Sequence, residues 1–359
     1  MQCPTLKELP PPPPGKTGWP WTAETPPLPA TMPDGKPWPR FSVVTPTYNY
    51  DRFLERTIRS VLLQGYPNLE YIVVDGGSTD GTLGLIHKYE KWIARWVSER
   101  DGGVTPATNK GFRMTTGELL AWLGSDDNYL PGALNTAAQE MCRRPGCCIV
   151  NGDARGLNER RELLEVVRAG EVTRDRLVRF WTRPFLSASP PTVSLFYRRQ
   201  VADEVGWMDE TLQVVSDYEW WLRMSQKFLF HYVPFLFAEF CQHLGAVSSR
   251  FERFQEAETT AASRRYWGKP TQWRFWRMWA ECRVYWMKIR FCRMKSAWLS
   301  AAHQALAAGR RVRCLGWLLA AFVRSPAFTL RGGGAGLALR ALVGEACEQK
   351  LKRCLRWRS

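Results

Sequence analysis

The sequence has no apolar run long enough to cross a membrane and little material for a disulfide or zinc framework. A membrane-spanning helix needs roughly 18 consecutive apolar residues, and the longest apolar candidate, Cys314 to Val323, has about half that length. Ten cysteines are scattered without CxxC spacing, which favours reduced thiols over a disulfide framework or a zinc site. Prolines occupy the N-terminus where a secretory signal would need an apolar segment. We therefore expect a cytoplasmic protein.

Acidic residues are also in short supply. The chain has 34 acidic and 50 basic residues, which gives a net charge of +16 and a pI near 9.6. This balance suits an anionic partner, such as nucleic acid, a phosphorylated ligand or an acidic membrane surface. No nucleic-acid-binding motif accompanies the charge, so we do not expect nucleic acid to be the partner. The length of 359 residues and the 18 tryptophans allow a large core.

Composition divides the chain into three parts. Residues 1–39 are rich in proline, including the run Pro10 to Pro14, which predicts a disordered or polyproline extension. Residues 40–265 have the patterns of a folded domain. Residues 266–359 are basic and interleave Trp with Arg, and we expect a helical region there. Its helices either lie on an anionic membrane surface or simply pack against the domain.

Within the folded part, β-rich runs alternate with amphipathic helical patterns. The predicted strands cover residues 41–45, 71–74, 95–98 and 119–123. A first helix is predicted to begin near Asp51, after the first strand, and a second helix follows the second strand and carries apolar residues from Leu85 to Ile93 on one face. This alternation predicts an α/β fold with a mainly parallel, Rossmann-like sheet flanked by helices. Farther along, we expect a strand at 149–150, helix and loops over 155–185, a strand at 192–197 and a helix opening at Ser216.

Polar residues follow four of the predicted strands at the point where each ends. These residues are Thr45, Asp75, Glu99 with Asp101, and Asp126 with Asp127. In a parallel sheet, ligands bind beyond the carboxyl ends of the strands. Adjacent carboxylates such as Asp126 and Asp127 repel each other, and a divalent cation that carries a diphosphate relieves the repulsion. A surface turn is the alternative, because Ser-Asp-Asp-Asn is also favourable turn chemistry.

Five motifs in this order resemble those of the family 2 glycosyltransferases, which have the A-type nucleotide-diphospho-sugar transferase fold. The resemblance covers residues 40 to about 245. The motifs are Val43 to Asn49, Val74 to Thr82, Asp101-Gly102-Gly103 with Asn109-Lys110-Gly111, Ser125-Asp126-Asp127, and Ser216 to Arg223.

The resemblance implies an inverting, metal-dependent transferase of the hexosyltransferase type. Asp127 is then a direct ligand of Mn²⁺ or Mg²⁺, and Asp126 binds ribose, sugar or the metal through water. His243 is a further candidate for the metal or the diphosphate. The implied contacts to the nucleotide-sugar come from Thr45, Thr47, Tyr48, Asp75, Asp101, Asn109, Lys110 and Asp126.

Several of these assignments have structural alternatives. Asp217 is implied as the general base that deprotonates the acceptor hydroxyl, or it caps the helix that follows; Glu219 is the second candidate for the base. Asp75 contacts the uracil ring, or it forms a helix N-cap or an Asx turn with Gly76-Gly77-Ser78. Asp80 favours turn and cap chemistry over ligand binding.

Two positions depart from the family pattern. The second motif usually has two acidic residues before its glycine, whereas Gly76 directly follows Asp75. The third often has an aromatic and an acidic residue where Thr105 and Pro106 stand.

Taken together, the sequence predicts transfer of a sugar from a nucleotide-diphospho-sugar, with a UDP-sugar favoured through Asp75, to a hydroxyl of a lipid-linked or saccharide acceptor. Synthesis of cell-surface polysaccharide or glycolipid fits such an enzyme, working peripherally on the cytoplasmic face of the membrane. The alternative is a non-catalytic scaffold of the same fold at the membrane surface.

Overall fold

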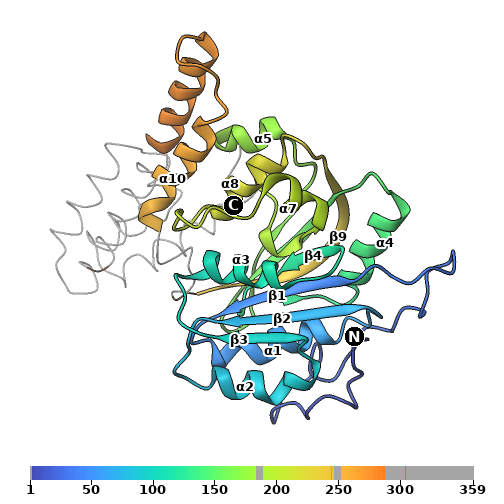
Figure 1. Cartoon of the computed structure of the whole chain (residues 1–359). Helices are drawn as coiled ribbons and strands as arrows, with labels where there is room; N and C mark the ends of the chain where they lie inside the picture. The colour runs from blue at the N-terminus through green and yellow to red at the C-terminus, as the bar shows by residue number, and fades with distance from the viewer. Residues whose placement is uncertain (1, 183–188, 244, 246–251, 288–303, 305–359) are drawn as a thin grey trace, which may run out of the picture. The chain divides into compact units, whose positions relative to one another are not determined.

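The computed structural model describes residues 2–182, 189–243, 245, 252–287 and 304 (Figure 1). The chain divides into two compact units, Met1–Met278 and Trp279–Ser359. The first unit thus extends beyond the predicted domain boundary at residue 265. Of the second unit the structure describes residues 279–287, which are helical, and residue 304. In the described part of the chain, no helix has both the length and the apolarity that crossing a membrane requires.

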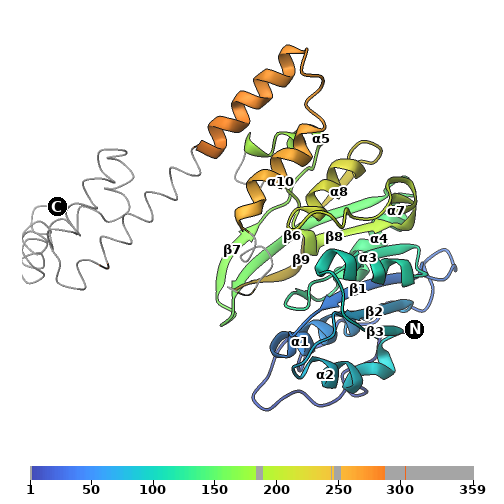
Figure 2. The same cartoon turned by 60° about the vertical axis from the view of Figure 1, so that its left-hand side comes forward.

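The first half of the domain alternates strands and helices as the periodicity predicts. The strands are β1 (Phe41–Thr47), β2 (Leu69–Asp75), β3 (Arg95–Ser98) and β4 (Leu119–Trp122), and every pairing among them is parallel. Helices α1 (Asp51–Leu62), α2 (Thr82–Tyr89) and α3 (Val104–Met114) provide the crossovers, with a short 3₁₀ turn η1 (Glu90–Trp92) after α2. Helices α1 and α2 cover one face of these strands and α3 covers the other (Figures 1 and 2).

The second half mixes both strand directions. It contains β5 (Asn128–Tyr129), α4 (Ala133–Arg143), β6 (Ile149–Asn158), β7 (Leu163–Val167), α5 (Arg174–Val178), η2 (Phe180–Thr182), η3 (Thr192–Ser194), β8 (Leu195–Arg198), α7 (Arg199–Val205), α8 (Ser216–Met224), β9 (Phe230–Gln242) and α10 (Glu252–Arg264). The sheet order is β3-β2-β1-β4-β8-β6-β9-β5, with β7 paired to β6.

The α/β prediction is confirmed, but "mainly parallel" holds only for the first half. Strand β8 runs antiparallel to both of its neighbours, and β5 and β7 are antiparallel to β9 and β6. The prediction of helix and loops over residues 155–185 is wrong in its first part. Strand β6 continues to Asn158, and the chain returns through β7 to form a hairpin. The strand predicted at 192–197 begins only at Leu195, since residues 192–194 form η3.

Alternation along the central strands builds two cores. Phe41 and Val43 of β1 and Tyr71 and Val73 of β2 belong to the hydrophobic cluster that includes α1 and α2 side chains. The residues between them face α3. There, a Cβ on Gly111 would stand 2.3 Å from a methyl of Val44, so glycine lets α3 approach the sheet closely. Burial on both faces is what a parallel sheet with helices on each side requires.

The prediction of disorder for residues 1–39 is wrong over the described residues 2–39. They form an irregular segment that packs on the domain, with Leu9, Trp21 and Trp38 buried. Its backbone carbonyls accept hydrogen bonds from Arg59 of α1, a fully buried guanidinium. The composition predicted disorder because proline dominates, but the apolar residues between the prolines supply enough surface to bury.

Candidate functional site

The carboxyl ends of the parallel strands meet at one rim of the sheet. Thr47 at the end of β1 pairs with Asp75 at the end of β2, and Asp75 pairs with Ser98 at the end of β3. The segment Gly124–Asp127 follows β4, which runs beside β1. The polar residues that the sequence placed after separate strands therefore lie along the same edge.

Asp126 and Asp127 turn their carboxylates toward the same point. A Cβ on Gly124 would lie 2.8 Å from Asp127 Oδ2 and 3.0 Å from Asp126 Oδ1, so glycine leaves room for both groups. Asp127 Oδ1 accepts a hydrogen bond from the Cys241 amide at 3.1 Å. Burial raises the pKa of the Asp127 carboxyl well above its usual value, and the charge of Asp126 raises it further. Two crowded carboxylates of this kind favour a cation between them.

His243 joins this pair from the end of β9. Its Nε2 lies 2.9 Å from Asp126 Oδ2, and its side chain is only 4% exposed. The imidazole stacks on Phe53, with 5.1 Å between ring centroids, and meets Tyr50 edge-on. His243 is thus placed at the predicted site, where it holds Asp126.

The donor set suits a hard divalent cation only in part. No group of three or more His, Cys, Asp or Glu side chains in the described residues is arranged to hold a metal ion by itself. The Asp126 and Asp127 carboxylates nevertheless offer the oxygen ligands that Mg²⁺ and Mn²⁺ prefer. A cation here would need further oxygens from a bound ligand or water, which matches a metal that carries a diphosphate.

Asp75 is buried and its carboxylate organises the loop that follows it. Its oxygens accept hydrogen bonds from the amides of Gly77 and Ser78, at 3.1 and 2.9 Å, and from the Ser98 hydroxyl at 2.6 Å. The Asx-turn alternative therefore describes what Asp75 does in this structure. Asp101 lies against the same loop, because a Cβ on Gly76 would stand 3.1 Å from its carboxylate. Glycine at position 76 is what admits the Asp101 side chain.

Residues 78–82 also fasten the turn after β1. The Ser78 hydroxyl accepts from the Asn49 amide, and the Asn49 side chain accepts from the Thr79 amide, both at 2.8 Å. Asp80 accepts from the amides of Asp51 and Thr82, which is the turn and cap role predicted for it. The second motif therefore fixes the shape of the adjoining loop.

In the part of the chain that the structure describes, Thr47, the last residue of β1, and Tyr48, which follows it, have side chains that are not used in hydrogen bonds of the turn after β1. The buried Thr47 hydroxyl has no hydrogen-bond partner among the described residues. The Tyr48 ring is 54% exposed. The Tyr48 side chain is therefore accessible at the rim, and the Thr47 hydroxyl has an unused hydrogen-bonding capacity.

Three predicted contact residues are engaged elsewhere. Thr45 is buried, and its hydroxyl accepts from Tyr71 at 3.1 Å. Asn109 is buried and uses its amide on the backbone of Met208 and on Glu210. Lys110 pairs with Glu99 at 2.7 Å. In this structure the Thr45 and Asn109 side chains serve the fold, and their contact with a nucleotide-sugar stays a prediction.

Asp217 lies in the first turn of α8, close to the start of α3. Its oxygens accept from the Thr192 hydroxyl at 2.8 Å and from the Tyr218 amide at 2.7 Å. Burial raises the pKa of the Asp217 carboxyl, and these two hydrogen bonds oppose the rise. The neighbouring Ser216 hydroxyl lies 2.7 Å from the hydroxyl of Thr105. The helix N-cap is Val215, so Asp217 does not have the predicted capping role.

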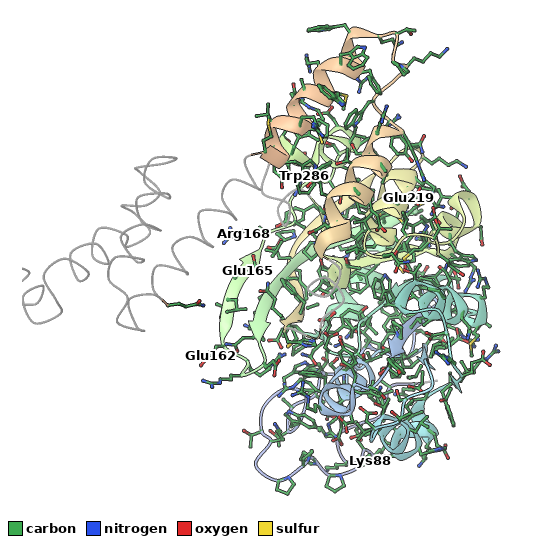
Figure 3. The ribbon with its side chains drawn as sticks, turned by 90° about the vertical axis from the view of Figure 1, so that its left-hand side faces the viewer. Lys88, Glu162, Glu165, Arg168, Glu219 and Trp286 are labelled. Carbon is green, nitrogen blue, oxygen red and sulfur yellow. The ribbon has the colours of Figure 1, made fainter. Side chains whose placement is uncertain are left out.

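Glu219, the second candidate for the base, is buried and paired with two arginines. Arg223 contacts it at 2.9 Å and Arg265 at 3.2 Å. Figure 3 shows Glu219 on α8. Both guanidinium groups occupy the Glu219 oxygens, which leaves Asp217 as the better candidate for the base.

Sequence reasoning missed Thr192, Arg161 and Glu258. Thr192 contacts Asp217. Arg161 of the β6–β7 turn lowers the pKa of Asp127 through its charge and forms an ion pair with Glu239. Glu258 of α10 accepts from the backbone before α8. None of them lies in a motif, and each reaches the site through a contact between segments far apart in the chain.

Comparison with known proteins supports the assignment of the fold and family. The family model described as "Glycosyl transferase family 2" matches residues 42–205. TuaG of Bacillus subtilis, a candidate glycosyltransferase of teichuronic acid biosynthesis, is 38% identical over 109 residues, which are 30% of this chain and 43% of TuaG. An uncharacterized glycosyltransferase of Rickettsia felis is 26% identical over 197 residues, or 54% of this chain and 33% of the relative. The chain therefore spans less than half the length of these relatives.

Among solved structures, residues 1–349 of S. aureus TarS in complex with UDP-GlcNAc superpose with a TM-score of 0.51 at 20% identity. The match covers 63% of this chain and 67% of TarS 1–349, and it shows a shared fold. The family match, the glycosyltransferase relatives and this fold agree with one another: residues 42–205 match the model of glycosyl transferase family 2, and the chain shares its fold with the TarS structure.

Proposed function

We propose that this protein is an inverting, metal-dependent glycosyltransferase that moves a sugar from a nucleotide-diphospho-sugar to a hydroxyl acceptor. The observation that carries the proposal is the Asp126–Asp127 pair at the rim, where both carboxylates turn toward one point and the pKa of Asp127 is raised. Such a pair is unfavourable by itself and becomes favourable when a cation is bound.

Asp127 and Asp126 would hold Mn²⁺ or Mg²⁺, and His243 would fix the orientation of Asp126. A divalent metal bound there would neutralise the negative charge that develops on the leaving diphosphate. The packing of His243 on Phe53 and Tyr50 restricts the imidazole, so Asp126 keeps one orientation when the donor binds. Such support of a ligating side chain typically raises metal affinity.

The nucleotide would lie on the turn after β1 and the loop after β2. Tyr48 offers an exposed ring for the base, and the unpartnered Thr47 hydroxyl offers a hydrogen bond. Asp75 and Asp101 line the same loop. A uridine nucleotide fits the predicted role of Asp75, and the TarS structure that shares the fold contains UDP-GlcNAc.

Asp217 would accept the proton of the acceptor hydroxyl as that oxygen attacks the anomeric carbon. Direct displacement from the opposite face inverts the anomeric centre and needs no covalent intermediate. Burial raises the pKa of Asp217, which makes the carboxylate a stronger base than an exposed aspartate. The hydrogen bond that Thr192 donates lowers the pKa of Asp217 and so favours the ionised form that a general base requires.

The acceptor is proposed to be a saccharide or a lipid-linked saccharide in cell-surface polysaccharide or glycolipid synthesis. The TuaG match supports this setting. Lys269, Arg274 and Arg277 surround Trp273 and Trp276 in sequence, and the two indoles are 78% and 51% exposed. Exposed indoles beside basic groups suit an anionic membrane surface on the cytoplasmic side.

A non-catalytic scaffold of the same fold is the second candidate. It is favoured by the internal use of Asp75, Asn109 and Thr45, whose side chains all serve the structure. It predicts neither donor binding nor a metal requirement.

A thermal-shift panel of nucleotide-sugars, with and without Mn²⁺, separates the two candidates. The transferase predicts stabilisation by one donor that requires the metal, followed by product formation with that donor. A ligand at 100 times its Kd stabilises the folded state by about 2.7 kcal/mol, which this assay resolves. Absence of any donor-dependent shift would favour the scaffold.

A further inference from the structure

The carboxylate of Glu258 binds the backbone that leads into α8. One oxygen accepts from the Gln213 amide at 2.8 Å, and the other accepts from the amides of Val214 at 2.9 Å and Val215 at 3.3 Å. These are consecutive donors directly before Ser216, the first residue of α8. Amides at a helix start have no partners inside the helix, and a negative charge there is favourable.

Helix α10 is attached to α8 at a second point. Arg265, the residue after α10, contacts Glu219 at 3.2 Å, and Glu219 is held by Arg223 of its own helix. Figure 3 shows α10 running beside α8, with Glu219 on the latter. The two helices are therefore joined at the beginning and in the middle of α8, and neither α8 nor α10 lies within residues 42–205 of the family match.

Asp217 follows closely on the segment that Glu258 contacts. It is the second residue of α8, so any movement of residues 213–215 moves its carboxylate. Its partner Thr192 and the Ser216–Thr105 contact come from other segments, and they meet α8 only when the helix starts in the observed place. Displacement of a reacting group by about 1 Å can cost on the order of 100-fold in rate.

We propose that Glu258 is a positioning residue that fixes the start of α8 and thereby the candidate base Asp217. The inference rests on the proposed function and adds a residue outside the family match to it. Among the described residues, Glu258 is hydrogen-bonded to the backbone amides of residues 213–215 and not to the Asp126–Asp127 pair. Its loss should therefore slow transfer without weakening the binding of the donor.

The test compares Glu258→Ala and Glu258→Gln with the control Glu256→Gln. The control removes one negative charge from the same helix and leaves Glu258 and its hydrogen bonds to residues 213–215 in place. Hydrogen–deuterium exchange of the peptide covering residues 213–219 is measured beside the kinetics. We expect Glu258→Ala to speed exchange of this peptide at least tenfold and to lower kcat between 10- and 100-fold. The KM for the donor should change less than threefold. Glu258→Gln, which keeps one accepting oxygen, should recover part of kcat.

Two results would overturn the inference while leaving the proposed function intact. One is that the wild type is active and that Glu258→Ala has the same kcat after correction for the fraction of folded protein. The other is a parallel loss of kcat and donor affinity, which a general loss of structure would produce. A wild type with no transfer activity on any donor refutes the proposed function itself, and the inference with it.

Discussion

Arg59 provides the sharpest prediction about how the N-terminal segment is held. This arginine of α1 is fully buried, and its guanidinium donates to the carbonyls of Pro10 at 2.8 Å, Pro20 at 3.0 Å and Trp21 at 3.1 Å. It also donates to the Tyr89 hydroxyl at 3.1 Å. Arg59→Met keeps an unbranched apolar side chain in place of the aliphatic stem of arginine and removes every one of these donors. The carbonyls of the segment would then be buried without partners.

The expected cost follows from these hydrogen bonds. Each is worth about 1 kcal/mol net, and leaving a buried acceptor unpaired costs about 1–3 kcal/mol. The apolar methionine recovers part of this by burial, so we expect a net loss of about 2–4 kcal/mol. For a domain of this size, that corresponds to a fall in Tm of roughly 4–16 °C, measured by scanning calorimetry.

A matched control lies on the same helix. Arg52 is 69% exposed and pairs with Glu159 at 3.7 Å, so Arg52→Met should change stability by less than about 0.5 kcal/mol. Limited proteolysis should cut residues 2–39 sooner in Arg59→Met than in the control. Equal Tm values for the two variants would show that Arg59 does not hold the segment, and the reasoning would fail.

Three further predictions concern the site. Asp127→Asn should remove the stabilisation by Mn²⁺ and should flatten the dependence of Tm on pH in the absence of metal. The reason is that the pKa of Asp127 is raised in the folded state, so the wild type loses stability as the pH rises from about 4 through that pKa. Identical curves of Tm against pH for the two proteins would contradict this. Thr192→Val should move the acidic limb of the kcat–pH profile to higher pH, since the lost hydrogen bond lowered the pKa of Asp217, while Thr192→Ser should leave it in place. Asn109→Ala should cost about 2–3 kcal/mol in calorimetry with donor affinity within threefold, and a large loss of affinity would restore Asn109 as a contact.

The first half of the fold was predictable because local sequence dictates it. Apolar strands such as Tyr71–Val74 and amphipathic helices such as α1 alternate, and parallel pairing follows from the crossovers. The β6–β7 hairpin was not predictable, because the charged residues that follow Arg155 give a pattern typical of a surface helix, whereas pairing with β9 and between the two strands places them in the sheet. The N-terminal segment was missed for a related reason, since its carbonyls are hydrogen-bonded to Arg59, a residue far along the chain.

The candidate site divides in the same way. Carboxylates at strand ends were identified because the rim of a parallel sheet gathers them, and Asp126 with His243 is the best example. The internal roles of Asn109 and Thr45 could not be predicted, because their partners Met208 and Tyr71 are distant in sequence. Residue type and position show which groups reach the rim, whereas hydrogen bonds between segments decide which groups remain free there.

Calorimetric titration of UDP into the full chain, with and without Mn²⁺, tests most directly whether the Asp126–Asp127 pair holds a metal that carries a diphosphate. The account predicts saturable binding of UDP that requires Mn²⁺, and loss of that binding in Asp127→Asn while the variant remains folded. Equal binding of UDP without metal, or undiminished binding by Asp127→Asn, would contradict it.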